Sequence, residues 1–238
     1  MSSGLVHLAG RVWIHPHDPD PDHIQGCVAV VADDRGSVVV DAGNSPTVAR
    51  QVLDGMGAAG LPAARWLVYT HHHWDHVWGA VAWDDVEIVA HASNRPILEA
   101  EAARPWSHAY LRDEVERDPL LGPSFRARAR AMPSFDGFAI RPPDTVFDDT
   151  LTLPVGVRLH HVGGQHAVDS IVVTVPDDRV RLLGDCFYPP PFHLRREGDA
   201  HDLDMVRGLL VDGIDWYVDA HSAPQSAADV AAFVTEPS

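Results

Sequence analysis

Residues 70–76 read THHHWDH, a stretch that places four histidines and one aspartate among seven residues. His71 and His73 are two positions apart, which puts them on one side of an extended chain but on nearly opposite sides of a helix. A metal held by both therefore requires extended backbone, and Asp75 continues the same side. His76 reaches the same place only if the chain turns, as it does where a helix starts. Imidazole and carboxylate groups together suit zinc, iron or manganese. The alternative interpretation of the same stretch is a polar loop that is rich in histidine and binds no metal.

Three further candidate ligands lie at the ends of apolar runs in the C-terminal half. His166 lies on the loop GGQHAVD directly before the run SIVVTV, Asp185 ends the run RVRLLGD, and His221 ends DWYVDAH. Loops at strand ends are where a packed scaffold holds functional side chains. Each of these residues alone is more often structural, but their order beside THHHWDH points to a single metal site.

The remaining sequence alternates strand and helix patterns in two halves of a single domain, residues 1–238. Two β-rich runs surround the turn DDRG, and Ser45 and Pro46 form a start signal for the helix that follows. Strands are predicted at 27–32, 37–41, 65–70, 86–91, 150–153, 157–162, 170–175, 179–185 and 215–221, and helices at 200–213 and 226–234. Residues 93–131 are rich in Ala, Arg, Glu and Leu at helical spacing, so they are predicted to form a helical insertion. Two sheets packed face to face, with helices outside, satisfy this α/β pattern.

The composition limits the class of protein and of partner. Hydrophobic residues make up 45% and charged residues 22%, as in an ordinary globular domain, and two cysteines favour a reducing compartment. No signal peptide or membrane span is indicated, so we expect a cytoplasmic protein with no membrane partner. The formal net charge of −16 repels phosphate backbones and argues against a nucleic-acid partner. A small-molecule substrate is expected, and the oligomeric state stays open.

The order of HHHWDH, His166, Asp185 and His221 resembles the metallo-β-lactamase-fold hydrolase superfamily, whose pattern is His-x-His-x-Asp-His followed by a distant His, Asp and His. The resemblance extends from VVVDAG near the start of the chain to DAHS near its end. It implies a four-layer αβ/βα sandwich with the site along one edge of the two sheets. The loop GQHAV departs from the family's Gly-His-Thr or Gly-His-Ser, and Asp185 stands where the commonest zinc β-lactamases have cysteine.

The resemblance also implies a ligand set and two divalent ions, expected to be zinc, with iron or manganese as alternatives. The first ion would bind His71, His73 and His166, the second would bind Asp75, His76 and His221, and Asp185 would bridge them. Asp41, in VVVDAG, would either position a ligand imidazole or cap the end of its strand.

The activity implied is a dinuclear metal-dependent hydrolase that attacks a small-molecule ester, thioester or lactone with a metal-bridging hydroxide. Asp75 would orient the nucleophile's proton, and Tyr188 would help to hold the substrate's carbonyl oxygen, as a tyrosine does in lactonases of this superfamily, or would only pack. The insertion would cap the site, its Trp106, Tyr110 and Phe125 either lining an apolar pocket or packing against the body. A mononuclear iron oxidoreductase of the persulfide-dioxygenase type and a non-catalytic metal-binding protein are the alternatives.

Overall fold

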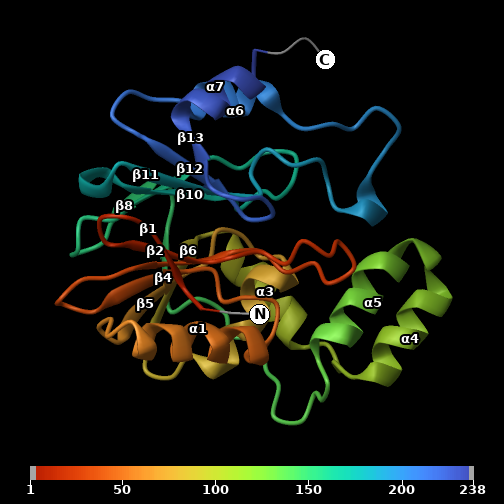
Figure 1. Cartoon of the computed structure of the whole chain (residues 1–238). Helices are drawn as coiled ribbons and strands as arrows, with labels where there is room; N and C mark the ends of the chain where they lie inside the picture. Colours follow the sequence, from red (N-terminus) through yellow and green to blue (C-terminus); the bar gives the residue numbers. More distant parts are fainter. Residues whose placement is uncertain (1–3, 236–238) are drawn as a thin grey trace.

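Two β-sheets pack face to face in the computed structural model, which describes residues 4–235 (Figure 1). The seven strands of the first sheet lie in chain order: β1 Val6–Ala9, β2 Val12–His15, β3 Val28–Val31, β4 Ser37–Val40, β5 Ala64–Val68, β6 Glu87–His91 and β7 Thr145–Phe147. The second sheet has the order β13-β12-β11-β10-β9-β8, with β8 Thr150–Thr152, β9 Arg158–His161, β10 Ile171–Val175, β11 Val180–Gly184, β12 Trp216–Asp219 and β13 Gln225–Ser226.

Helices cover the outer faces of both sheets, so the predicted four-layer αβ/βα sandwich is confirmed (Figure 1). The α-helices are α1 Pro46–Ala58, α2 Trp74–Val77, α3 Asn94–Ala102, α4 His108–Arg117, α5 Gly122–Ala131, α6 Leu203–Leu209 and α7 Ala227–Phe233. Four 3-10 turns are η1 Trp78–Ala82, η2 Pro119–Leu121, η3 Pro176–Asp178 and η4 Phe192–Leu194. Helix α1 begins as its sequence predicts, because the Ser45 side chain accepts a hydrogen bond from the Val48 amide and Pro46 takes the first helical position.

Three hydrophobic clusters correspond to the three interfaces between the four layers. Along β4, Val39 belongs to the cluster under α1, whereas Val38 and Val40 belong to the cluster between the sheets. This alternation is the two-residue period of a strand that is buried on both faces. The third cluster joins the outer face of the second sheet to α6 and α7 through residues such as Val206 and Val230.

Parallel strands bring the candidate ligands to one edge of the sandwich. In the first sheet β4, β5 and β6 are parallel, and in the second sheet β11 and β12 are parallel. The chain segments that leave β4, β5, β11 and β12 at their carboxyl ends carry Asp41, the THHHWDH stretch, Asp185 and His221. The two sheets therefore present these segments to each other across their shared edge.

The insertion between β6 and β7 contains α3, α4 and α5, as the composition of residues 93–131 predicts. Helices α4 and α5 stand at one end of the sandwich, and the segment after β11 extends towards them (Figure 1). Turn η2 of the insertion contacts turn η4 of that segment. The insertion thus adjoins the edge that carries the candidate ligands.

Some elements differ from the sequence-based expectation. Strands β1, β2, β7 and β13 were not predicted; each has two to four residues and is ordered by pairing with a neighbouring strand. Helix α6 is shorter than the predicted 200–213, since Asp202 caps its start and Leu210 is already extended. Among residues 4–235, none of the helices is long and apolar enough to cross a membrane.

Candidate metal centre

The backbone around THHHWDH changes from extended to helical within the stretch. His73 has extended dihedrals (φ −64°, ψ 146°) and is the N-cap of α2. The expectation that Asp75 continues an extended side is therefore wrong, because the helix begins at Trp74 and Asp75 lies in its first turn. The turn expected for His76 is present, but the helix already begins at Trp74 and so includes Asp75 as well. It brings Asp75 and His76 together on the same short helix.

Three imidazole nitrogens converge in the first group of candidate ligands. His73 Nδ1 lies 2.9 Å from His71 Nε2 and 2.9 Å from His166 Nε2. His166 Nδ1 lies 2.9 Å from the Pro189 carbonyl oxygen, to which it donates, so the lone pair of His166 is on the Nε2 atom that faces the other two histidines. Three imidazole nitrogens that converge in this way can bind one cation together, which fits a metal with imidazole ligands.

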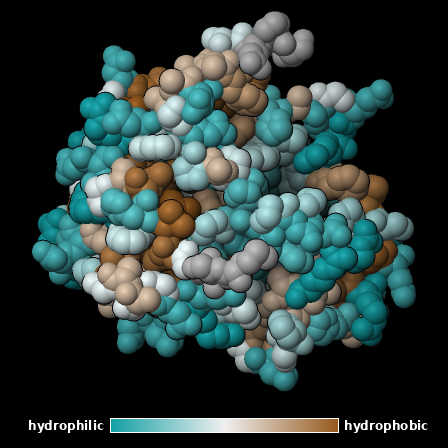
Figure 2. Space-filling view, viewed as in Figure 1, coloured by the Kyte–Doolittle hydropathy of each residue, from teal (hydrophilic) through white to brown (hydrophobic). Residues whose placement is uncertain are grey.

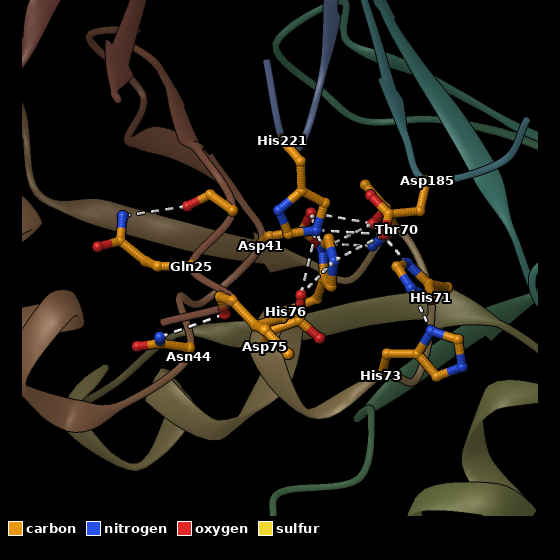
Figure 3. Close-up of polar contacts among 12 residues, drawn as sticks. Gln25, Asp41, Asn44, Thr70, His71, His73, Asp75, His76, Asp185 and His221 are labelled. Carbon is orange, nitrogen blue, oxygen red and sulfur yellow. Dashed lines mark hydrogen bonds and ion pairs between the residues drawn. The ribbon is translucent and has the colours of Figure 1, made fainter. Parts of the chain in front are cut away.

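A second group combines two carboxylates with two imidazoles. Asp75 Oδ2 lies 3.2 Å from His76 Nε2 and 3.3 Å from His221 Nε2, while Asp185 Oδ2 lies 3.3 Å from His221 Nε2. Figure 3 shows these side chains pointing toward one another from segments of both sheets. His76 Nε2 and Asp185 Oδ1 are buried without a hydrogen-bond partner among the described residues. Buried polar atoms are rarely left in that state, so a bound cation fits this group as well.

Asp185 lies between the two groups. Its Oδ2 atom is 3.3 Å from His166 Nε2 in the first group, the same separation as from His221 Nε2 in the second. A carboxylate in that place can face two cations at once. The structure thus brings together all seven predicted ligands in the predicted grouping: His71, His73, Asp75, His76, His166, Asp185 and His221.

Asp41 fills both of the roles proposed for it. Its Oδ1 accepts a hydrogen bond from the Thr70 amide at 2.8 Å, which caps the end of β5. Its Oδ2 accepts from Thr70 Oγ1 at 2.9 Å and from His76 Nδ1 at 2.8 Å, which leaves the lone pair of His76 on Nε2. Thr70 Oγ1 also lies 3.1 Å from His71 Nδ1, so the carboxylate orients imidazoles of both groups. Gly184 (φ +54°) leaves room for Thr70, because a Cβ there would lie 2.8 Å from Thr70 Oγ1.

Burial and neighbouring charges shift the pKa values in opposite directions within the site. Burial lowers the pKa of His71 and His73 well below the ordinary value, so both are neutral and able to bind a cation. Burial opposes ionisation of Asp75, but His76 and His221 outweigh it and lower its pKa. Burial likewise opposes protonation of His221, yet Asp185 and Asp75 raise its pKa to about 10. In the metal-free chain, protons on imidazoles balance the carboxylates, and these are the protons that a bound cation would replace.

Tyr188 lies beside the two groups, with its ring centroid 6.3 Å from that of His166 and 6.0 Å from that of His221. Its hydroxyl donates a hydrogen bond to Asp219 Oδ1 at 3.1 Å. Burial, followed by the Asp219 charge, raises the pKa of the phenol. The phenol is therefore neutral, and a role in holding a substrate's oxygen stays a prediction that requires the hydroxyl to leave Asp219.

A pocket of about 270 Å³ opens beside the first group, between the insertion and the segment after β11. Its lining includes His73 and the buried Phe125, whereas Trp106 packs on Trp78 behind it. The lining is His72, His73, Trp74, Val77, Trp78, Leu98, Glu101, Arg104, Leu121, Phe125, Arg128, Ile140, Pro191, His193 and Leu194. Leu120, Phe192 and Leu194 are exposed in the neighbouring turns, and Figure 2 shows hydrophobic surface where Figure 1 places the segment after β11 above α5.

The sequence pattern did not identify two groups of residues near the site. His72 belongs to neither metal group, and its Nδ1 lies 2.7 Å from Asp169 Oδ1, while the Asn94 side-chain amide donates to Asp169 Oδ2 at 2.7 Å. The other is the pair of pocket arginines, Arg104 and Arg128. Neither group has a sequence signal of its own, because each is assembled from segments that meet only in the folded chain.

Comparison with known proteins agrees with this geometry. Residues 21–207, well over half of the chain, match the metallo-beta-lactamase superfamily. The chain belongs to the metallo-beta-lactamase superfamily. The resemblance identified from the sequence is thereby confirmed, and members of this superfamily are mostly metal-dependent hydrolases that bind divalent ions, often zinc.

Among curated proteins, the chain is similar to the linear primary-alkylsulfatase of Pseudomonas sp. (strain ATCC 19151), with 29% identity over 227 residues. That match covers 82% of this chain but only 41% of the relative, so the chain spans less than half of the relative's length. Similar solved structures include the metallo-beta-lactamase from Hirschia baltica (19% identity, TM-score 0.62, 98% of each chain). Another is FIM-1 from Pseudomonas aeruginosa in its mono-zinc form (17% identity, TM-score 0.62, 98% of this chain and 96% of that one). At these identities the solved structures establish the fold alone.

Proposed function

We propose that this protein is a dinuclear metal-dependent hydrolase of a small-molecule ester, thioester or lactone. The observation that carries the proposal is the position of Asp185, whose Oδ2 atom lies 3.3 Å from an imidazole nitrogen of each ligand group. One carboxylate between a group of imidazoles and a group that adds a second carboxylate, Asp75, supports a pair of adjacent divalent ions rather than a single ion. We propose zinc for both, with iron or manganese as alternatives.

Bound divalent ions would supply Lewis acidity and lower the pKa of a water molecule towards about 7, which provides a nucleophile at neutral pH. The chain's own residues position the reaction. Asp75 is buried beside His76 and His221, and we propose that its carboxylate orients the nucleophile's proton. We propose that Tyr188 donates a hydrogen bond to the substrate's carbonyl oxygen, which gains charge during attack. The insertion at 93–131, which lines the pocket through Leu98, Phe125 and others, would cap the site and exclude water.

The substrate is proposed to be a small molecule rather than nucleic acid, because the net charge is −16 and the pocket is enclosed between two surface segments. A sulfate ester is the second candidate substrate, since the curated relative is named a linear primary-alkylsulfatase. Hydrolysis of a sulfate ester, by attack of water at its sulfur or at its carbon, would use the same metal groups. An iron oxidoreductase or a non-catalytic metal protein remains the alternative if hydrolysis is absent.

Metal content and a substrate screen test the proposal together. Purified protein should carry close to two divalent ions per chain by elemental analysis, and should hydrolyse at least one ester, thioester, lactone or alkyl sulfate. Asp185→Ala should lose both properties, whereas the control Asp34→Asn, in an exposed turn, should retain both. One iron per chain with no hydrolysis of any ester would favour the oxidoreductase and refute the dinuclear hydrolase.

A further inference from the structure

The pocket beside the metal groups is basic in a strongly acidic protein. The chain has a formal net charge of −16, yet the charged lining of this pocket consists of Arg104, Arg128 and a single carboxylate, Glu101. Glu101 Oε1 lies 2.9 Å from Arg104 Nη2, so that pair neutralises itself. Among residues 4–235, Arg128 has no carboxylate within ion-pair distance, and Glu101 and Asp75 act on its charge only from further away.

Arg128 is held among four aromatic rings. Its Cζ atom lies 4.4 Å from the ring centroid of Phe125, 5.3 Å from Trp106, 5.4 Å from Trp78 and 5.6 Å from Trp74. Cation–π contacts of this kind fix the plane of a guanidinium without using its N–H groups. The aromatic residues of the insertion and of α2 therefore orient Arg128 in advance.

Among residues 4–235, none is seen to accept a hydrogen bond from the Arg128 side chain. Across residues 4–235 no carboxylate lies within ion-pair distance of this guanidinium, and its Nε is buried without a hydrogen-bond acceptor. Burial lowers the pKa of Arg128 to about 10, so the group is still charged at neutral pH. A buried, charged donor without an acceptor is costly, and a planar guanidinium matches a carboxylate or sulfate oxyanion through paired hydrogen bonds.

We infer that Arg128 binds an oxyanion group of the ligand, with the ligand's apolar part against Leu98, Leu121 and Ile140 of the same pocket. His73, a candidate metal ligand, lines this pocket too, so the anionic group would sit beside the reacting bond. The inference that this ligand is a substrate rests on the proposed hydrolase function. The binding of the anion itself does not, because it depends only on Arg128 and its pocket.

Tryptophan fluorescence provides a direct test, because Trp74, Trp78 and Trp106 surround the guanidinium. Metal-loaded wild-type protein is titrated with 1-hexanesulfonate, hexanoate and neutral hexan-1-ol, which share a chain length but differ in head group. We expect at least one of the two anions to bind about tenfold or more tightly than the alcohol. A preference for the sulfonate supports a sulfate-type group and a preference for hexanoate supports a carboxylate.

Variants at Arg128 assign the effect to this residue. Arg128→Gln should weaken binding of the preferred anion about tenfold or more and leave hexan-1-ol within about twofold, while Arg128→Lys should give an intermediate affinity. Arg126→Gln, on the exposed face of the same helix, is the matched control and should bind as wild type does. Circular dichroism and metal content establish that each variant is folded and loaded.

Two results would overturn the inference. One is equal affinity of the wild-type protein for the anions and the alcohol. This measurement needs no variant, so it decides the question even if Arg128→Gln fails to fold. The other is a folded Arg128→Gln variant that binds the anions as the wild type does. Because none of these titrations measures turnover, a protein that hydrolyses no ester can still show Arg128-dependent binding, and a working hydrolase can still lack it.

Discussion

Asp41→Asn isolates what one carboxylate contributes to the metal groups. Asparagine tolerates the positive φ of +64° at this position, so the backbone is not strained by the change. The amide oxygen can still accept from the Thr70 amide, but an NH₂ group replaces the Oδ2 that accepts from Thr70 Oγ1 and His76 Nδ1. That NH₂ donates to His76 Nδ1, which moves the imidazole proton to Nε2, the atom that faces Asp75 and Asp185.

The size of the effect follows from those contacts. A protonated Nε2 cannot bind a cation, and loss of such an orienting partner lowers metal affinity by about 10–100-fold. The two hydrogen bonds that Oδ2 accepts contribute about 1.5–3 kcal/mol each, and the new bond from the NH₂ group to His76 Nδ1 and the lower cost of burying an amide offset part of that loss. The metal-free variant should therefore lose about 2–3 kcal/mol of its free energy of unfolding.

Competition against a chromogenic chelator measures both Zn²⁺ dissociation constants, and urea unfolding measures stability. The site that contains His76 should weaken more than the site built on His71, His73 and His166. The matched control is Asp144→Asn, whose carboxylate accepts a hydrogen bond from the Ile88 amide and belongs to neither metal group, and which should change stability alone. Two zinc ions bound by Asp41→Asn with wild-type affinity would refute the tautomer argument.

Four other changes have defined outcomes. Asp185→Ala should reduce elemental zinc content from about two ions per chain towards one, because both groups lose a shared carboxylate; full occupancy would exclude the bridge. Tyr188→Phe should lower turnover on the best substrate by about 10²–10³ with unchanged metal content, and an unaltered rate would assign the residue to packing. Gly79→Ala should cost about 1–3 kcal/mol or more in urea unfolding, since its Cβ would collide with the Ala42 carbonyl oxygen; unchanged stability would contradict the close approach of those segments. Removal of zinc by chelation should lower the melting temperature. If the free zinc concentration had been a hundred times its dissociation constant, the free energy of unfolding falls by about 2.7 kcal/mol. An unshifted transition would mean that zinc does not bind the folded state preferentially.

The ligand set could be predicted because its members lie beside the ends of recognisable apolar runs and their order resembles the pattern of a known family. Parallel strands then bring those ends to one edge, so a linear order of residues translates into a spatial group. The helical start inside THHHWDH was harder, since a four-residue helix has no periodicity of its own and Asp75 was placed on an extended side. Asp41 was recognised as either a partner of an imidazole or a strand cap, and its two oxygens serve both purposes.

The pocket could not be predicted in the same way. Arg128 lies in a run of alternating Arg and Ala whose letters do not distinguish an exposed arginine from an enclosed one. Its surroundings come from four segments, namely α2, η1, the approach to α4 and α5 itself, and only the packing of these segments encloses its guanidinium. Trp106 and Phe125 were expected either to line a pocket or to pack, and Phe125 lines it whereas Trp106 packs behind Arg128.

Each ligand group draws residues from both sheets, which gives bound ions a mechanical role. His73 belongs to the first half of the chain and His166 to the second, 93 positions later, and the second group is divided in the same way. Ions in these positions would be cross-links between two halves that are otherwise held by apolar packing and by polar contacts such as His72 with Asp169. A cross-link closing a loop of that length removes about 4–5 kcal/mol of chain entropy from the unfolded state. The chain cut within the turn between β7 and β8 should accordingly reassemble from its two pieces more tightly with zinc than without, because the candidate metal centre would also cross-link the two sheets.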